Sequence, residues 1–213
     1  MFMANQISFD NEAIKTDPEK HIAEAVHQIL ISIGEDPDRE GLVQTPKRVA
    51  DMFTELTTGY HDDLKTLVNG AIFHVDYAEM VIVRDIDFSS LCEHHLLPFF
   101  GKVHVAYIPD GRVIGLSKLP RIVEMYARRL QMQERMTVEI ADTLQRILSP
   151  KGVAVLVEAK HTCSMIRGVK KINAQMQTKS MLGIFEQDLS VRNEFLSLLA
   201  RGNNEHIHQS DVV

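Results

Sequence analysis

Residues 103–115 read VHVAYIPDGRVIG, in which two short apolar segments are separated by the tripeptide PDG. Proline and glycine beside an aspartate are typical of a tight turn, and short apolar segments on either side of a turn are typical of strands. We therefore predict strands at Val103–Ile108 and Val113–Gly115, joined as a hairpin. This makes an antiparallel sheet the expected framework of the protein.

On both sides of this pair, the sequence predicts more strands and several helices. Further strands are predicted at Ile72–Val75, Met80–Ile86, Val153–Ala159 and Ser180–Phe185. Apolar residues at helical spacing predict helices from Ser117 to about Leu130, from Gln133 to Leu148 and from Leu189 to Ala200. This order of elements indicates an α+β fold with an antiparallel sheet covered by helices on one face.

The first part of the chain has a helical pattern. Asp17 before a proline is a helix-start signal, because aspartate can cap the helix and proline costs little in the first turn. Thr45-Pro46 starts a second helix in the same way. We predict three regions: an N-terminal helical extension at 1–65, a main domain at 66–201 and a flexible tail at 202–213.

Charge and composition exclude several classes of protein. The 213 residues carry a net charge of −6, whereas sequence-independent nucleic-acid binding needs a broad basic surface. Hydrophobic residues make up 45% and charged residues 24%, which argues against disorder. No apolar run approaches the ~20 residues of a membrane span, and no secretory signal pattern is seen. We expect no nucleic-acid partner, no membrane partner and a cytoplasmic location.

Both cysteines of the chain lie close to histidines. Cys92 and His95 are close enough in sequence for one turn to bring them to one metal ion, and Cys163 is the natural third ligand far downstream. Two sulfurs and one imidazole suit zinc better than magnesium or calcium. Three protein ligands leave the fourth tetrahedral position for water, which is typical of catalytic zinc.

Other interpretations of these residues stay open. An isolated cysteine is most often a small buried core residue, and an isolated histidine is most often a hydrogen-bonded polar group. A closed zinc site with His94 or His161 as fourth ligand is a further alternative. If residues 161–163 are extended, His161 shares a face with Cys163 and lies beside the metal as a general acid or base.

Cationic side chains gather near the start of one predicted helix and after the second cysteine. Free N–H groups at a helix start favour an anion such as phosphate; the alternative is a solvated helix start with ordinary surface cations. Glu134, in the first turn of the next helix, either meets the helix dipole or accepts two hydrogen bonds from guanine. The cations that could hold a polyphosphate are Lys118, Arg121, Arg167, Lys170 and Lys171.

Longer segments resemble the type I GTP cyclohydrolase family. The matching segments are TPKRVADMF, LCEHHLLPFFGKVHVAYIP, VIGLSKLPRIVEMYARRLQMQERMT, HTCSMIRGV and SMLGIFEQD. They span roughly residues 20–200 in the family's order, which is far more specific than any single short motif. The resemblance implies the tunnelling fold, an antiparallel four-stranded sheet with two helices on one face, and a homodecamer with active sites between subunits.

The resemblance also implies an activity and the residues that perform it. The family opens the imidazole ring of GTP by zinc-dependent hydrolysis, releases formate and forms 7,8-dihydroneopterin triphosphate, the first step of tetrahydrofolate and pterin biosynthesis. A non-catalytic zinc-stabilised nucleotide-binding module is the alternative. The implied zinc ligands are Cys92, His95 and Cys163. The implied catalytic residues are His94, His161 and Ser117, and the implied GTP contacts are Gln133, Glu134, Lys118, Arg121 and Arg167.

Overall fold

The computed structural model describes residues 17–205, and the side chains of residues 17–200. The chain divides into two compact units, one ending at Thr57 and the other beginning at Thr58. The boundaries predicted after residues 65 and 201 stay predictions. Most of the predicted tail, and the first 16 residues, lie outside the described part of the chain.

The first unit contains a pair of helices. In α2 (Pro18–Ser32), the Asp17 side chain accepts a hydrogen bond from the backbone N–H of Lys20 at 3.1 Å, and proline occupies the first position. α3 (Thr45–Leu56) begins at the predicted residue and contacts α2. Both helix starts predicted for this unit are therefore confirmed.

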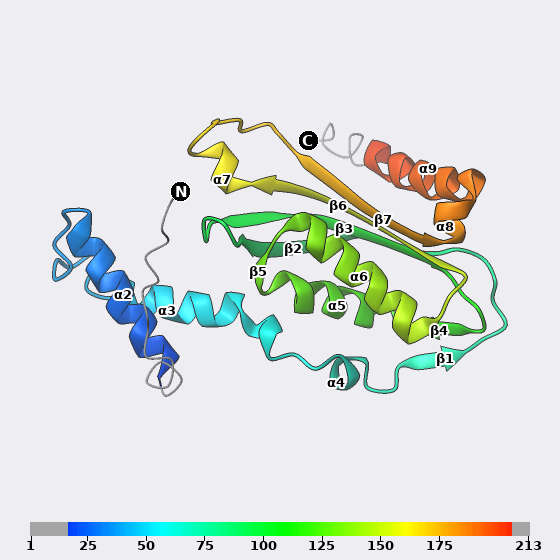
Figure 1. The fold of residues 1–213 in the computed structure, drawn as a ribbon, viewed down its shortest axis with the longest axis horizontal. Coiled ribbons are helices and arrows are strands. Elements are labelled where there is room, and N and C mark those ends of the chain that lie inside the picture. The colour runs from blue at the N-terminus through cyan, green and yellow to red at the C-terminus, as the bar shows by residue number, and fades with distance from the viewer. Residues whose placement is uncertain (1–16, 206–213) are drawn as a thin grey trace, which may run out of the picture. The chain divides into compact units, whose positions relative to one another are not determined.

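The second unit is built around a five-stranded sheet (Figure 1). In spatial order its strands are β5 (Leu130–Gln131), β2 (Val81–Cys92), β3 (Pro98–Ile108), β6 (Gly152–His161) and β7 (Met176–Gly183). The four long strands pair antiparallel, whereas the two-residue β5 runs parallel to the end of β2. The predicted α+β class with an antiparallel sheet is confirmed, and the sheet has one short strand more than the four implied by the resemblance.

The hairpin predicted for residues 103–115 is wrong. Its second segment, β4 (Arg112–Ile114), pairs with β1 (Ile72–His74) in a separate two-stranded sheet. Gly111 does adopt a positive φ of 75°, as a tight turn requires. However, β3 is already paired with β2 on one edge and with β6 on the other, which leaves no free edge for β4.

Helices lie on both faces of the sheet, not on one face as predicted (Figure 1). α5 and α6 form the larger core with one face. On the other face, Phe185 and Phe195 of α8 and α9 pack against Ala106 and Ala154, whose small side chains leave room for the two rings. The helical segments of this unit are η1 (Thr58–Tyr60), α4 (Leu64–Val68), α5 (Lys118–Ala127), α6 (Gln133–Leu148), α7 (Thr162–Met165), α8 (Ile184–Gln187) and α9 (Leu189–Glu205).

Among residues 17–205, no helix has the length and apolar character that crossing a membrane requires. The cytoplasmic location expected from the sequence stays a prediction.

Candidate metal centre and active site

The turn between β2 and β3 carries three of the predicted site residues. Cys92 ends β2, and its backbone N–H donates to the carbonyl of Leu97 at 2.9 Å. The backbone N–H of His95 donates back to the carbonyl of Cys92 at 3.3 Å, and Leu96 takes a left-handed φ of 54°. This tight turn places the Cys92 Sγ 3.7 Å from Nδ1 of His94 and 3.9 Å from Nδ1 of His95.

The end of β6 brings the last candidate ligand to this turn. The register of β3 and β6 places His161 opposite Phe99. The chain then enters α7, which contains Cys163, and the Thr162 hydroxyl donates to the carbonyl of Pro98 at 2.6 Å. Residues 161–163 are therefore not extended as the sequence argument supposed, because this hydrogen bond ties the helical turn to the start of β3.

Cys92, His95 and Cys163 form a compact group of metal-binding side chains. One ligand atom from each lies within 4.8 Å of the other two. Burial and the neighbouring Cys92 thiol raise the pKa of the Cys163 thiol. A bound cation would reverse that preference, because a coordinating thiol loses its proton. Two sulfurs and one imidazole are a donor set that binds zinc and other soft transition metals.

His161 lies next to this group and is held on two sides. Its ring stacks on Phe99, with ring centroids 4.5 Å apart and planes inclined by 5°. Its Nε2 lies 2.8 Å from Oε1 of Gln133, the buried first residue of α6. Burial lowers the pKa of His161, and the carboxylate of Glu134 opposes this shift. Phe99 was not predicted as part of the site, since its place in an apolar strand does not reveal its partner on β6.

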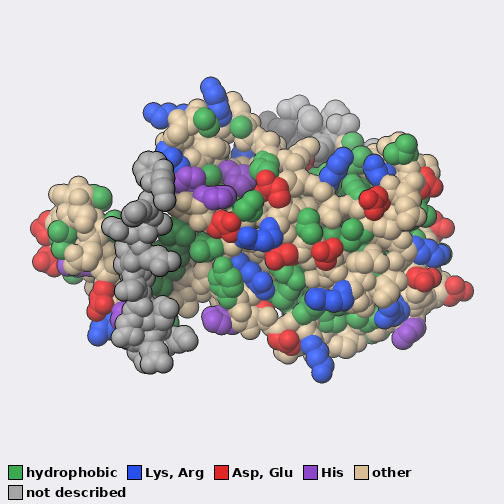
Figure 2. Space-filling view, in the orientation of Figure 1, with side chains coloured by type: hydrophobic (Ala, Val, Ile, Leu, Met, Phe, Trp, Pro, Cys, Tyr) green, Lys and Arg blue, Asp and Glu red, His purple; other side chains and the backbone are tan. Residues whose placement is uncertain are grey.

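A cavity of about 290 Å³ borders the candidate site. Figure 2 shows histidine side chains grouped at the surface near the end of the unit where α7 lies, in agreement with the exposure of His94 and His95. The site is therefore open to a ligand from solvent. The residues lining the cavity are His161, Cys163, Ser164, Ala174, Gln175 and Met176.

Three of the predicted GTP contacts lie close to the metal-binding group. Glu134 is exposed and close enough to His161 to affect its pKa. Arg167 is exposed, and its charge acts to lower the pKa of Cys163. Gln133 is next to Glu134 in sequence, but its side chain is buried and points into the protein, toward His161.

The other predicted contacts, Ser117, Lys118 and Arg121, lie at the start of α5. Lys118 Nζ donates to the carbonyl of Leu67 at 2.8 Å, and Ser117 does not cap the helix with its side chain. The ten-residue α5 is ~15 Å long and leads to β5, which pairs beside Cys92 (Figure 1). A single chain therefore does not bring these three residues to the metal-binding group.

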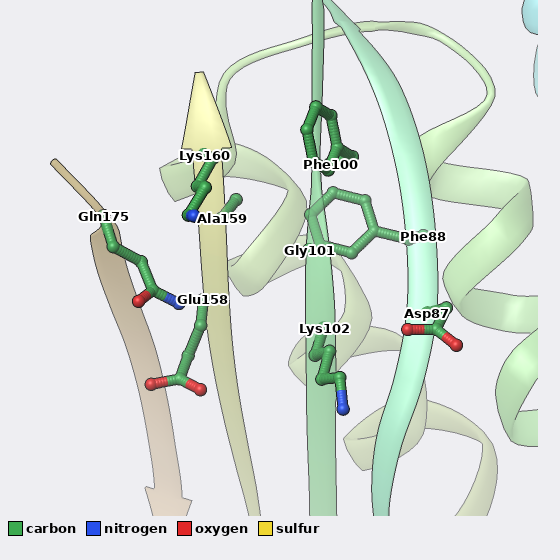
Figure 3. A pocket seen from close by; sticks show the side chains of 9 residues that line it. All are labelled: Asp87, Phe88, Phe100, Gly101, Lys102, Glu158, Ala159, Lys160 and Gln175. Carbon is green, nitrogen blue, oxygen red and sulfur yellow. The ribbon is translucent and has the colours of Figure 1, made fainter. Parts of the chain in front are cut away.

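Another cavity, of about 460 Å³, opens between β2, β3 and β6 (Figure 3). Phe100 and Lys160 face each other on neighbouring strands, one position along from Phe99 and His161. Because successive strand residues point to opposite faces, Phe100 and Lys160 point away from the candidate site. The charged residues that line this cavity are of both signs: Asp87 and Glu158 are acidic, and Lys102 and Lys160 are basic. This cavity contains no candidate metal ligand.

The fold and the site together define a class of protein. A group of one histidine and two cysteines that could hold a metal ion, next to a firmly held histidine, is typical of metal-dependent hydrolytic enzymes. The family model of GTP cyclohydrolase I matches residues 22–200. The chain therefore belongs to the GTP cyclohydrolase I family, and the family assignment made from the sequence is confirmed.

Individual relatives agree with this assignment. "GTP cyclohydrolase 1" of Methylococcus capsulatus is 60% identical over 174 residues, which cover 82% of this chain and 94% of that protein. "GTP cyclohydrolase 1 2" of Nostoc sp. is 51% identical over 199 residues, 93% of this chain and 92% of that protein. These matches confirm the prediction that the chain is an enzyme. Among solved structures, "archaeosine synthase QueF-Like in the apo form" aligns with 49% of this chain and 93% of its own, at 20% identity and a TM-score of 0.42, which is too distant to add to this assignment.

Proposed function

We propose that this enzyme opens the imidazole ring of the guanine of GTP by hydrolysis, releases the ring carbon as formate and forms 7,8-dihydroneopterin triphosphate. This reaction begins tetrahydrofolate and pterin biosynthesis. The observation that carries the proposal is the convergence of Cys92, His95 and Cys163 beside the anchored His161, in a chain of this family.

Zinc is the metal that we propose for the site. Cys92, His95 and Cys163 would hold it, and three protein ligands leave a position for water. When bound, zinc supplies a Lewis acid that makes water nucleophilic near neutral pH. Of the two alternative fourth ligands, His94 and His161, the second already bonds Gln133 through Nε2, so a closed site would have to use His94 or Nδ1 of His161.

His161 acts as the general acid at the guanine imidazole ring. A proton given to a ring nitrogen makes the neighbouring carbon more electrophilic, so that water can attack it. The stack on Phe99 and the bond to Gln133 keep His161 in place for this transfer. The exposed His94, with Ser117, serves the later proton transfers at the sugar.

Recognition of GTP requires both groups of predicted contacts. Glu134 binds the guanine edge, while Arg167, Lys118 and Arg121 hold the triphosphate, which is not cleaved. Because α5 separates Lys118 and Arg121 from the metal-binding group, a complete site needs these residues from another subunit. This separation supports a homo-oligomer with active sites between subunits. We propose the family's homodecamer as that oligomer and the family's tunnelling fold for each subunit.

The direct test is to incubate the protein with GTP, with and without a zinc chelator, and to follow formate and the pterin absorbance band. We expect one formate per GTP, a pterin product and loss of both on chelation. Replacement of His161 by alanine should abolish turnover while the metal stays bound. GTP binding without formate would instead support the alternative of a non-catalytic zinc-stabilised nucleotide-binding module.

A further inference from the structure

Gln133 is a buried amide whose polar atoms are all bonded. Its side chain is 1% exposed, although it begins a helix next to the exposed Glu134. Its Nε2 lies 3.0 Å from the carbonyl oxygen of Val157, 3.1 Å from that of Met176 and 3.1 Å from Oγ1 of Thr178. Its Oε1 lies 2.8 Å from Nε2 of His161.

The acceptors around Gln133 allow only one orientation of its amide. The carbonyls of Val157 and Met176 cannot donate, so the NH₂ end must face them. Thr137 gives its single hydroxyl proton to the backbone carbonyl of Gln133 at 2.7 Å. In the 2.6 Å contact between the two threonine hydroxyls, Thr178 is therefore the donor, and its oxygen is a third acceptor that shares the two N–H hydrogens of Gln133 with the two carbonyls.

This orientation determines which nitrogen of His161 carries a proton. The end of the Gln133 amide that faces His161 is a carbonyl oxygen, which only accepts. Nε2 of His161 must therefore carry a proton and donate it to this hydrogen bond. Nδ1 is then the ring nitrogen left to exchange a proton, and the stack on Phe99 holds the plane of the ring.

We propose that Gln133 is a positioning residue that fixes His161 as the Nε2–H tautomer and so makes Nδ1 the nitrogen that exchanges a proton with the substrate. This inference rests on the proposed function, and it replaces the role in guanine binding that the resemblance implied for Gln133. Before the transfer His161 is an imidazolium with N–H at both nitrogens; the N–H bond at Nδ1 breaks, its electron pair stays on Nδ1, the proton forms the new bond to the purine nitrogen, and the neutral Nε2–H tautomer remains. Thr137, Thr178 and the two carbonyls hold Gln133 in the orientation that this requires.

The first test separates positioning from substrate binding by steady-state kinetics of the metal-loaded protein. Gln133→Met keeps the volume but removes both ends of the amide, so kcat should fall about 100-fold while KM for GTP changes less than about threefold. A role in guanine binding would raise KM instead. Gln145→Met is the matched control, since Gln145 lies on the same helix three turns away and its side chain donates to the carbonyl of Pro150, away from the site.

Thr178 supplies a second variant in case Gln133→Met does not fold. Thr178→Val preserves shape but removes the hydroxyl that accepts from Gln133, and kcat should fall about 10-fold. Thr178→Ser restores the hydroxyl and should restore kcat. A merely structural role would not distinguish serine from valine in kcat at equal thermal stability.

The tautomer can be observed without turnover. Histidine labelled with ¹⁵N, in metal-loaded protein without GTP, reports by NMR which ring nitrogen carries hydrogen, and a His161→Asn sample identifies the signals of His161. We expect Nε2–H in the wild type and in Gln145→Met, and a mixture of tautomers in Gln133→Met. An Nδ1–H tautomer in the wild type, or unchanged kcat in Gln133→Met, would overturn the inference. Absence of formate from the wild type would overturn the proposed function alone, because the spectrum still decides the tautomer.

Discussion

His161 and His94 flank the same metal-binding group but are held in opposite ways. His161 lies between the ring of Phe99 and the amide of Gln133, at the end of a long strand inside a five-stranded sheet. His94 is exposed in the turn between two strands, where its Nδ1 lies 3.7 Å from the Cys92 sulfur. The difference separates a histidine whose geometry is set before substrate binds from one that can adjust.

This contrast matches two kinds of proton transfer. A proton delivered to one atom of a rigid purine ring benefits from a fixed donor, because small displacements of the donor are costly. Proton transfers at a sugar that opens and recloses need a group able to follow several positions. In the proposed mechanism, the anchored histidine is therefore assigned to the first chemical step and the exposed histidine to the later ones.

The largest expected effect comes from disrupting the metal-binding group that both histidines flank. Cys163→Ala leaves two protein ligands, so bound zinc should fall below detection after dialysis, and formate release should be lost with it. Metal content by mass spectrometry, measured alongside formate, checks this. As a control, Ser164→Ala changes the adjacent residue of α7 without removing a ligand and should keep the metal. Full metal content in Cys163→Ala would show that the site is not the one described.

The contrast between the histidines should also appear in stability. His161→Ala leaves the buried Oε1 of Gln133 without its donor and removes the stack on Phe99, so the free energy of unfolding should fall by about 1–3 kcal/mol. His94→Ala removes an exposed side chain and should change it by less than about 0.5 kcal/mol. Urea unfolding of both variants, each metal-loaded and at equal protein concentration, measures the difference. Equal losses of unfolding free energy in the two variants would contradict the contrast between an anchored and an exposed histidine.

Local patterns in the sequence predicted much of the fold. α6 runs from Gln133 to Leu148 as predicted, because its apolar stripe and its ends are all encoded nearby in the chain. The same holds for the start of α2 at Pro18. Pairing between strands was less predictable: the turn after Ile108 has a clear signal, yet the next strand pairs with β1, since partners are chosen by which edges remain free.

The same distinction applies to the site: residues close in sequence were predictable, whereas contacts made by the fold were not. Cys92 and His95 are three residues apart, so a single turn brings them together, and only Cys163 depended on the fold. The support for His161 could not be predicted from spacing. Gln133 meets Val157, Met176 and Thr178 only because α6 packs across β6 and β7, whose register is a property of the whole sheet.

His104, a buried histidine on β3, extends the comparison to pH. Its Nδ1 accepts from the backbone N–H of Asp85 at 3.2 Å, and burial lowers its pKa, although the carboxylates of Asp85 and Glu158 oppose the shift. The unfolded chain, with a histidine pKa of about 6.5, therefore takes up the proton first as pH falls. Stability should be lost as pH falls below about 6.5. The free energy of unfolding should drop more in the wild type than in His104→Gln between about pH 7.5 and about pH 5.5; parallel slopes would contradict this.

The smallest effect concerns the turn that carries His94. Arg135, at the start of α6, forms an ion pair with Glu93 and donates from Nε to Oε1 of Gln131 at 2.9 Å. Because both charged side chains are partly exposed, Arg135→Met should cost less than about 1 kcal/mol of unfolding free energy. Part of that cost should disappear between about 0.05 M and about 0.5 M NaCl, as salt screens the pair. Lys47→Met, which breaks the exposed pair with Asp51, is the matched control and should show a smaller and equally screened loss. A salt-independent loss in Arg135→Met would assign the stabilisation to the bond with Gln131, and the exposed turn would then be held by the interior as His161 is.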